Sequence, residues 1–202
     1  MKVYVQQYCA LGRQYLLIKS IYMMAENAAH NRRSIDEKQT TGGARMIAII
    51  DYDAGNIKSV EKALHYLGEE TVVSRDPQVL LSADKVILPG VGSFGDAMNN
   101  LNKFGLVPVI RELTEKGTPF LGICLGLQLL FESSDETPGV EGLGILKGKI
   151  VKIPPAPGLK IPHMGWNSLH LQNDGRLFKG IPEETYVYFV HSYYIQTKEP
   201  EI

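Results

Sequence analysis

The chain has 202 residues, of which 44 % are hydrophobic and 21 % are charged, and its formal net charge is −1. The length suits one sizeable α/β domain, and the composition is ordinary for a globular protein. A charge this close to neutral gives no reason to expect a nucleic acid or a membrane surface as a partner.

Residues 1–45 differ in character from the rest of the chain. The stretch VYVQQYCALGRQYLLIKSIYMMA is apolar, but Arg13 and Lys19 interrupt it. It therefore falls short of the ~18 uninterrupted apolar residues of a membrane-spanning helix. No small-residue cleavage site of a signal peptide follows it. The polar stretch ENAAHNRRSIDEKQTTGGAR is typical of a flexible linker. We expect a flexible N-terminal extension, with Met46 as the natural start. An amphipathic N-terminal helix is the alternative.

Short apolar runs alternate with helical patterns after Met46. Runs bounded by turn residues predict strands at 47–51, 70–74, 85–89 and 119–123. Apolar residues at helical spacing predict helices at 56–68, 95–103 and 106–116, with Gly68 and Gly117 where two of them end. This order predicts a mostly parallel sheet with helices on both faces.

The pattern changes after Gly139. Segments 143–154, 159–172 and 185–196 favour strands joined by Pro and Gly turns. We expect them to form a mixed or antiparallel extension of the sheet.

Cys124 lies between two glycines in the stretch GTPFLGICLGLQLLFESS, after an apolar strand and before an apolar helix. Paired glycines permit a tight, strained turn of the kind that presents a nucleophile. A helix N-terminus also favours the thiolate. Ligands gather at the carboxyl ends of parallel strands, where DYDAGN and PGVGSFG form two further glycine-bearing turns. This context favours a nucleophile over a small buried residue, and the buried sides of the helix come from Leu127, Leu129, Leu130 and Phe131.

Cys9 is the chain's other cysteine. The two cysteines do not make a disulfide framework, and no CxxC or Cys/His cluster indicates zinc. We therefore expect a reducing, cytoplasmic setting. Asp51 and Asp53 could suggest a metal pair, but two aspartates without a third ligand are weak evidence for one.

A thiolate that attacks an amide needs donors for the oxyanion that forms. The backbone N–H of Leu125 is one natural donor, and glycines in the loop PGVG (89–92) leave further N–H groups free to point at a substrate. A tight turn without a catalytic role is the alternative for this loop. By residue type alone, His191 in VYFVHSYY is the candidate base, although a histidine among aromatic residues is more often a hydrogen-bonded strand histidine than a catalyst.

The stretch FLGICLGLQLLFE, with Gln128 four residues after the cysteine, resembles the nucleophile region of class I (triad-type) glutamine amidotransferases. Four further stretches occur in the order found in the glutaminase subunits of imidazole glycerol phosphate synthases: IIDYDAGN, ILPGVGSFGDAM, IPHMGWN and YFVHSYY. The resemblance runs from Met46 to about Ile195. It implies a flavodoxin-like α/β fold, hydrolysis of L-glutamine in histidine biosynthesis, and no metal or cofactor.

The resemblance also implies a role for each matching residue. Cys124 attacks the side-chain amide of glutamine and forms a glutamyl thioester. The oxyanion is stabilised by the backbone of Gly90, Val91, Gly92 and Leu125. The substrate is held by Gln128 and the backbone near His191, Tyr193 and Tyr194. The partner is a cyclase subunit with a (β/α)8 barrel, which forms a heterodimer with this chain and receives the ammonia. Asn56, Met164 and Trp166 face this partner.

In that family the base and its orienting carboxylate come from a Phe-His-Pro-Glu stretch after a further strand. The 202 residues contain no such stretch. We expect a domain spanning 46–202 that lacks this His/Glu pair, as a C-terminally truncated copy would. Two alternatives stay open. One is a partner that docks on the cyclase without hydrolysing glutamine, and the other is a different Cys hydrolase of the same fold, such as a γ-glutamyl peptidase.

Overall fold

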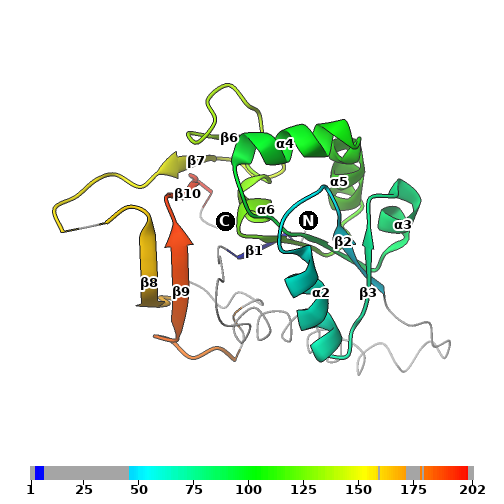
Figure 1. Ribbon diagram of the computed structural model, residues 1–202, viewed down its shortest axis with the longest axis horizontal. Coiled ribbons are helices and arrows are strands. Elements are labelled where there is room, and N and C mark those ends of the chain that lie inside the picture. The colour runs from blue at the N-terminus through cyan, green and yellow to red at the C-terminus, as the bar shows by residue number, and fades with distance from the viewer. Residues whose placement is uncertain (1–2, 7–45, 159, 172–177, 179, 200–202) are drawn as a thin grey trace.

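A computed structural model describes residues 3–6, 46–158, 160–171, 178 and 180–199. A five-stranded sheet with the strand order β1-β5-β4-β2-β3 lies at its centre (Figure 1). The strands are β1 (Val3–Gln6), β2 (Met46–Ile50), β3 (Glu70–Ser74), β4 (Lys85–Leu88) and β5 (Phe120–Ile123). Every neighbouring pair is parallel. The four predicted strands and their parallel pairing are confirmed.

Five helices surround this sheet in the described part of the chain. They are α2 (Ile57–Tyr66), α3 (Pro77–Ser82), α4 (Phe94–Lys103), α5 (Leu106–Glu115) and α6 (Leu125–Gln128). The short α3 was not predicted, although Asp76 followed by Pro77 is a start signal and the Asp76 carboxylate accepts from Gln78 N at 2.8 Å. None of the described helices combines the length and apolar character needed to cross a membrane.

Alternate residues of each strand pack against different helices. Ala48, Ile50 and Val86 belong to a core cluster with α4 and α5, whereas Ile47 and Ile49 pack with α2. A strand points successive side chains to opposite faces, so α2 covers one face of the sheet and α4 and α5 cover the other. The predicted helices on both faces are confirmed.

Glycines end two of the helices as predicted. Gly68 and Gly117 follow α2 and α5, and each has φ +76°. Gly68 N donates to His65 O at 3.0 Å, and Glu69 N donates to Leu64 O at 3.0 Å. These bonds satisfy the last carbonyls of α2, and they need a left-handed residue that glycine adopts without strain.

The strands that follow α6 form two sheets of their own. The first holds β6 (Ser133–Ser134), β7 (Lys149–Lys152) and β10 (Tyr193–Gln196), and the second holds β8 (His163–Ser168) and β9 (Tyr186–His191). The predicted antiparallel pairing is confirmed for β10 with β7 and for β8 with β9. The prediction that they extend the central sheet is wrong, because they make no ladder with it. Residues 154–158, with three prolines that cannot donate to a ladder, carry the chain away after β7.

Residues 3–6 differ from the flexible extension expected there. They form β1, which pairs in parallel with β5 in the register Val3↔Phe120. The run VYVQ favours a strand, and the edge of β5 offers unpaired backbone groups to such a run. The rest of the predicted extension (7–45), including Cys9, lies outside the described residues.

Candidate active site

Cys124 sits on a strained turn directly after β5. Its φ of 53° and ψ of −114° are rare for a residue with a side chain, and it is the N-cap of α6. A Cβ added to Gly122 would lie 2.6 Å from Leu127 Cα, and one added to Gly126 would collide with the carbonyl oxygen of Leu88. Both neighbouring positions therefore require glycine. The predicted strand–turn–helix geometry around the cysteine is present.

The helix after Cys124 is shorter than its apolar sequence suggests. It ends at Gln128, after one turn. The expected apolar residues are still fully buried: Leu127, Leu129, Leu130 and Phe131. Cys124 itself is half-buried and free of any disulfide. One turn contributes less of a helix dipole to a thiolate than a full helix would.

The oxyanion loop, residues 89–92, connects β4 to α4 and packs against the start of α6. A Cβ added to Gly90 would lie 2.7 Å from Gly126 N and 3.0 Å from Leu125 Cβ. Gly90 is buried, whereas Val91 and Gly92 are exposed, and Gly92 has φ +108°. The structure thus brings the loop and Leu125 together next to the cysteine. Their role as oxyanion donors stays a prediction.

Tyr52 contributes to this site, and the sequence reasoning did not single it out. Its side chain is 1 % exposed, and its hydroxyl donates to Pro89 O at 2.8 Å. Burial, and then the negative charge of the Cys124 thiolate, raise the pKa of Tyr52. The available signal was an aromatic residue between Asp51 and Asp53 at the end of a buried strand.

Asp51 and Asp53, weighed above as a metal pair, share a cation of the chain itself. Arg75 Nη2 lies 2.7 Å from Asp51 Oδ2 and 2.6 Å from Asp53 Oδ1. Burial alone would raise the pKa of Asp51, but hydrogen bonds from Arg75 and from Asp53 N outweigh it and hold that pKa below its ordinary value. This ion pair ties the β2–α2 loop to the residue that follows β3.

The predicted substrate residues fall into two groups. Gln128 is buried on α6, one turn beyond the cysteine, while His191 ends β9 and Tyr193 and Tyr194 lie in β10. His191 Nδ1 donates to Tyr193 O at 3.0 Å, which leaves its Nε2 to accept from His163 Nδ1 at 3.1 Å. Both ring nitrogens of His191 are engaged, so this geometry does not favour His191 as the base.

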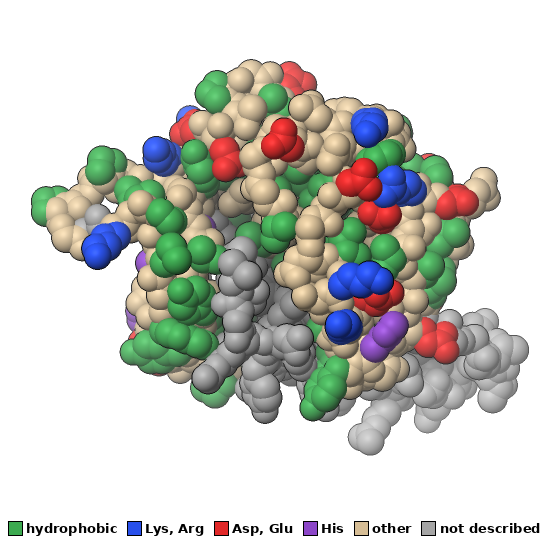
Figure 2. All heavy atoms as spheres, viewed as in Figure 1, with side chains coloured by type: hydrophobic (Ala, Val, Ile, Leu, Met, Phe, Trp, Pro, Cys, Tyr) green, Lys and Arg blue, Asp and Glu red, His purple; other side chains and the backbone are tan. Residues whose placement is uncertain are grey.

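The predicted partner-facing residues are exposed. Met164 and Trp166 lie on β8 with 60 % and 51 % of their surface exposed, and Figure 2 shows hydrophobic side chains over β8 and β9. Asn56 is exposed at the start of α2, in another part of the molecule (Figure 1). Their role in binding a partner stays a prediction.

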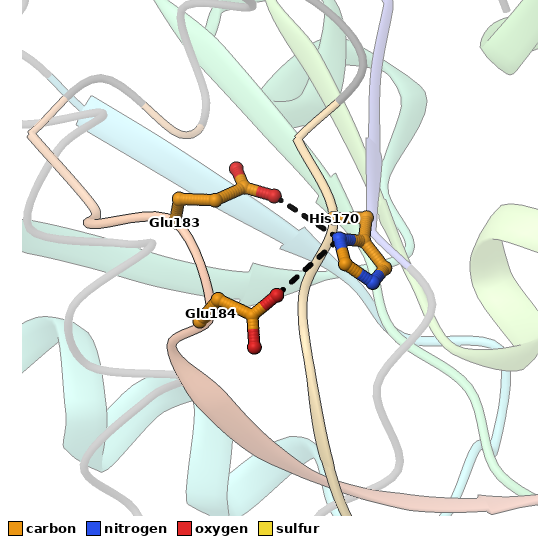
Figure 3. A group of neighbouring side chains, drawn as sticks. All are labelled: His170, Glu183 and Glu184. Atoms are coloured by element: carbon orange, nitrogen blue, oxygen red, sulfur yellow. Dashed lines mark hydrogen bonds and ion pairs between the residues drawn. The ribbon is translucent and has the colours of Figure 1, made fainter.

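One group of His and acidic side chains among the described residues is close enough to hold a metal ion (Figure 3). His170 Nδ1 lies 3.2 Å from Glu183 Oε1 and 3.6 Å from Glu184 Oε1. All three side chains are exposed. The imidazole contacts both carboxylates without any ion, so this group does not by itself indicate a metal.

Comparison with known proteins decides the family. The family model described as glutamine amidotransferase class-I matches residues 48–202. The chain belongs to this family. The matched range of the amidotransferase includes Cys124, the oxyanion loop and the β8–β9 pair.

Within this family, the chain is similar to the HisH subunits of imidazole glycerol phosphate synthases. The amidotransferase is 54 % identical over 158 residues to the imidazole glycerol phosphate synthase subunit HisH of Moorella thermoacetica. The alignment covers 78 % of this chain and 74 % of that protein. The amidotransferase is 52 % identical over 155 residues to the HisH of Aquifex aeolicus, with 76 % and 74 % covered. A crystal structure of a glutamine amidotransferase matches the fold with a TM-score of 0.60 at 19 % identity, covering 78 % of this chain and 76 % of that one. The predicted resemblance and fold class are confirmed.

Proposed function

We propose that this amidotransferase is the glutaminase subunit of an imidazole glycerol phosphate synthase, which releases ammonia from glutamine for histidine biosynthesis. The observation that carries the proposal is the identity of about half of all aligned positions with HisH subunits. The geometry supports it, because Cys124 stands on a strained turn next to a glycine-rich loop that can supply backbone donors.

The proposed chemistry begins at Cys124. Its Sγ attacks the side-chain amide carbon of glutamine, the C–N bond breaks and ammonia leaves, and a glutamyl thioester remains. Water then cleaves the thioester to glutamate and restores the thiol. The thiol proton reaches the leaving nitrogen through a base. The family resemblance assigns that base to a Phe-His-Pro-Glu stretch, which the 202 residues do not contain.

The neighbouring backbone would stabilise the charge that develops on the amide oxygen. The proposed donors are the N–H groups of Leu125 and of the oxyanion loop, which packs directly on α6. Removing one such donor typically lowers kcat by about 10²–10³-fold. The glutamine itself would be held by Gln128, His191, Tyr193 and Tyr194.

The proposed partner is a cyclase subunit with a (β/α)8 barrel that receives the ammonia. Trp and Met are enriched in protein interfaces. Trp166 and Met164 are exposed on β8. Asn56 would contact the same partner. Direct transfer would keep ammonia from being protonated in water.

The test measures glutamate release from glutamine by the chain alone and with the cyclase subunit and its ligand, together with formation of the cyclase product. Release that rises with the cyclase and supports product formation, once a Phe-His-Pro-Glu segment from a relative is appended to supply the base, is the expected result. Release without coupling to the cyclase would favour a different Cys hydrolase. The chain could instead bind the cyclase tightly and release no glutamate, even after a Phe-His-Pro-Glu segment from a relative is appended. That result would favour a partner that docks on the cyclase without hydrolysing glutamine.

A further inference from the structure

A buried phenol stands at the end of β2, beside the candidate nucleophile. Tyr52 is 1 % exposed, and a hydroxyl buried to this extent requires a hydrogen-bond partner. That partner is the carbonyl oxygen of Pro89, at 2.8 Å. Pro89 is the first residue of the oxyanion loop, so the bond joins the β2–α2 loop to the loop that follows β4.

This bond constrains one particular peptide unit. The Pro89–Gly90 peptide is planar, and its C=O and N–H groups point in opposite directions. Holding the carbonyl oxygen toward Tyr52 therefore fixes the direction of the Gly90 N–H. Gly90 packs closely there, because a Cβ at this position would meet Tyr52 Oη at 2.6 Å and Gly126 N at 2.7 Å.

The phenol keeps its proton under the conditions of the reaction. Burial and the negative charge of the Cys124 thiolate both raise the pKa of Tyr52. Since the hydroxyl donates to Pro89 O, its proton is held by a carbonyl and is not available for transfer to the substrate. Tyr52 is therefore placed to hold a backbone segment and not to act as an acid or a base.

We propose that Tyr52 is a positioning residue for glutamine hydrolysis: its hydroxyl holds the Pro89–Gly90 peptide, and with it the oxyanion loop, beside Cys124. This inference rests on the proposed glutaminase function. A phenylalanine at the same position would fill nearly the same space and remove the hydrogen bond that holds the Pro89–Gly90 peptide.

The test substitutes Tyr52→Phe in the chain with the Phe-His-Pro-Glu segment appended and measures glutamine hydrolysis in the complex with the cyclase subunit. We expect kcat to fall about tenfold or more, because oxyanion donors act mainly in the transition state. The KM for glutamine should stay within about twofold, since ground-state binding is untouched. Tyr66→Phe is the matched control, because Tyr66 is 79 % exposed on α2 and loses the same atom. Its kcat should equal that of the wild type.

A second readout separates the loop from the thiol. Alkylation of Cys124 by iodoacetamide does not use an oxyanion hole, so its rate against pH should coincide for Tyr52→Phe and the wild type. An unchanged kcat, or a rise in KM alone, would overturn the proposal. So would a shifted alkylation profile that accounts for the lost kcat, because Tyr52 would then act on the thiol. A wild type that releases no glutamate even with a Phe-His-Pro-Glu segment appended would refute the proposed function itself, whereas an active wild type with an equally active Tyr52→Phe refutes only the role of Tyr52.

Discussion

Single glycines determine how closely the backbone segments of the candidate site approach one another. At Gly126 there is room for a hydrogen and none for a methyl group, because the carbonyl oxygen of Leu88 occupies that space. At Gly68 the space is open, and only the left-handed φ of +76° favours glycine. The two positions thus separate close packing from backbone conformation as reasons for a glycine.

Gly126→Ala is expected to destabilise the fold by about 3 kcal/mol or more, because the end of β4 must move away from α6. Gly68→Ala should cost only about 1 kcal/mol, the strain of a left-handed alanine. Urea unfolding of the two variants and the wild type measures both. Equal losses for the two variants would contradict the close approach of Leu88 to α6.

The Asp51–Arg75 ion pair gives stability a pH dependence. The pKa of Asp51 is lowered in the folded chain, so its contribution is present above the unfolded carboxyl pKa and is lost as the pH falls through the folded one. In Arg75→Met only the burial that raises this pKa and the bond from Asp53 N remain. The wild type should therefore be the more stable near neutral pH, and its advantage should shrink as the pH falls.

Urea unfolding between about pH 3 and pH 7 measures this difference. Lys116→Met is the control, because it removes a lysine paired with Glu112 in an exposed helical ion pair. Such pairs contribute little to stability, so this variant should follow the wild type at each pH. A gap between Arg75→Met and the wild type that stays constant over this range would refute the assignment to Asp51.

At the scale of elements, β8 and β9 form a pair apart from the central sheet. Trp166 packs edge-on against Tyr188 with ring centroids 5.6 Å apart, yet about half of the indole stays exposed. An aromatic residue held by its neighbour and open to solvent on one side loses little conformational freedom when a partner binds. This arrangement suits a contact with the proposed cyclase partner.

Trp166→Ala is expected to weaken binding of the cyclase by about 2 kcal/mol, the size of a contact that dominates an interface. Its own unfolding free energy should change by much less, since the indole is half-exposed. Titration calorimetry gives the affinity and urea unfolding gives the stability. Tyr66→Ala serves as the control, because Tyr66 is exposed at the end of α2. Unchanged affinity in Trp166→Ala would remove this residue from the interface.

The sequence predicted the helices and strands more fully than the contacts between them. Apolar runs and glycines located four parallel strands and the turn at Cys124, because local patterns determine them. The same patterns could not say that β7 and β10 leave the central sheet, since a strand's sequence does not name its neighbour. Tyr52 and the Arg75 bridge were missed for a related reason. Each joins residues more than twenty positions apart, and only the fold brings them into contact.

At the scale of the whole molecule, one side of the central sheet carries the proposed chemistry. The carboxyl ends of β2, β4 and β5 supply Tyr52, the oxyanion loop and Cys124, and neighbouring parallel strands place all three together. The β8–β9 pair extends the molecule to one side of this sheet (Figure 1).

Glutamate release by the wild type and by Cys124→Ala, each with a Phe-His-Pro-Glu segment appended and in complex with the cyclase subunit, tests the central claim most directly. Cys124→Ala should bind the cyclase as tightly as the wild type and release glutamate at least about 10³-fold more slowly, because no thioester can form. Release at the wild-type rate by Cys124→Ala would contradict the assignment of Cys124 as the nucleophile.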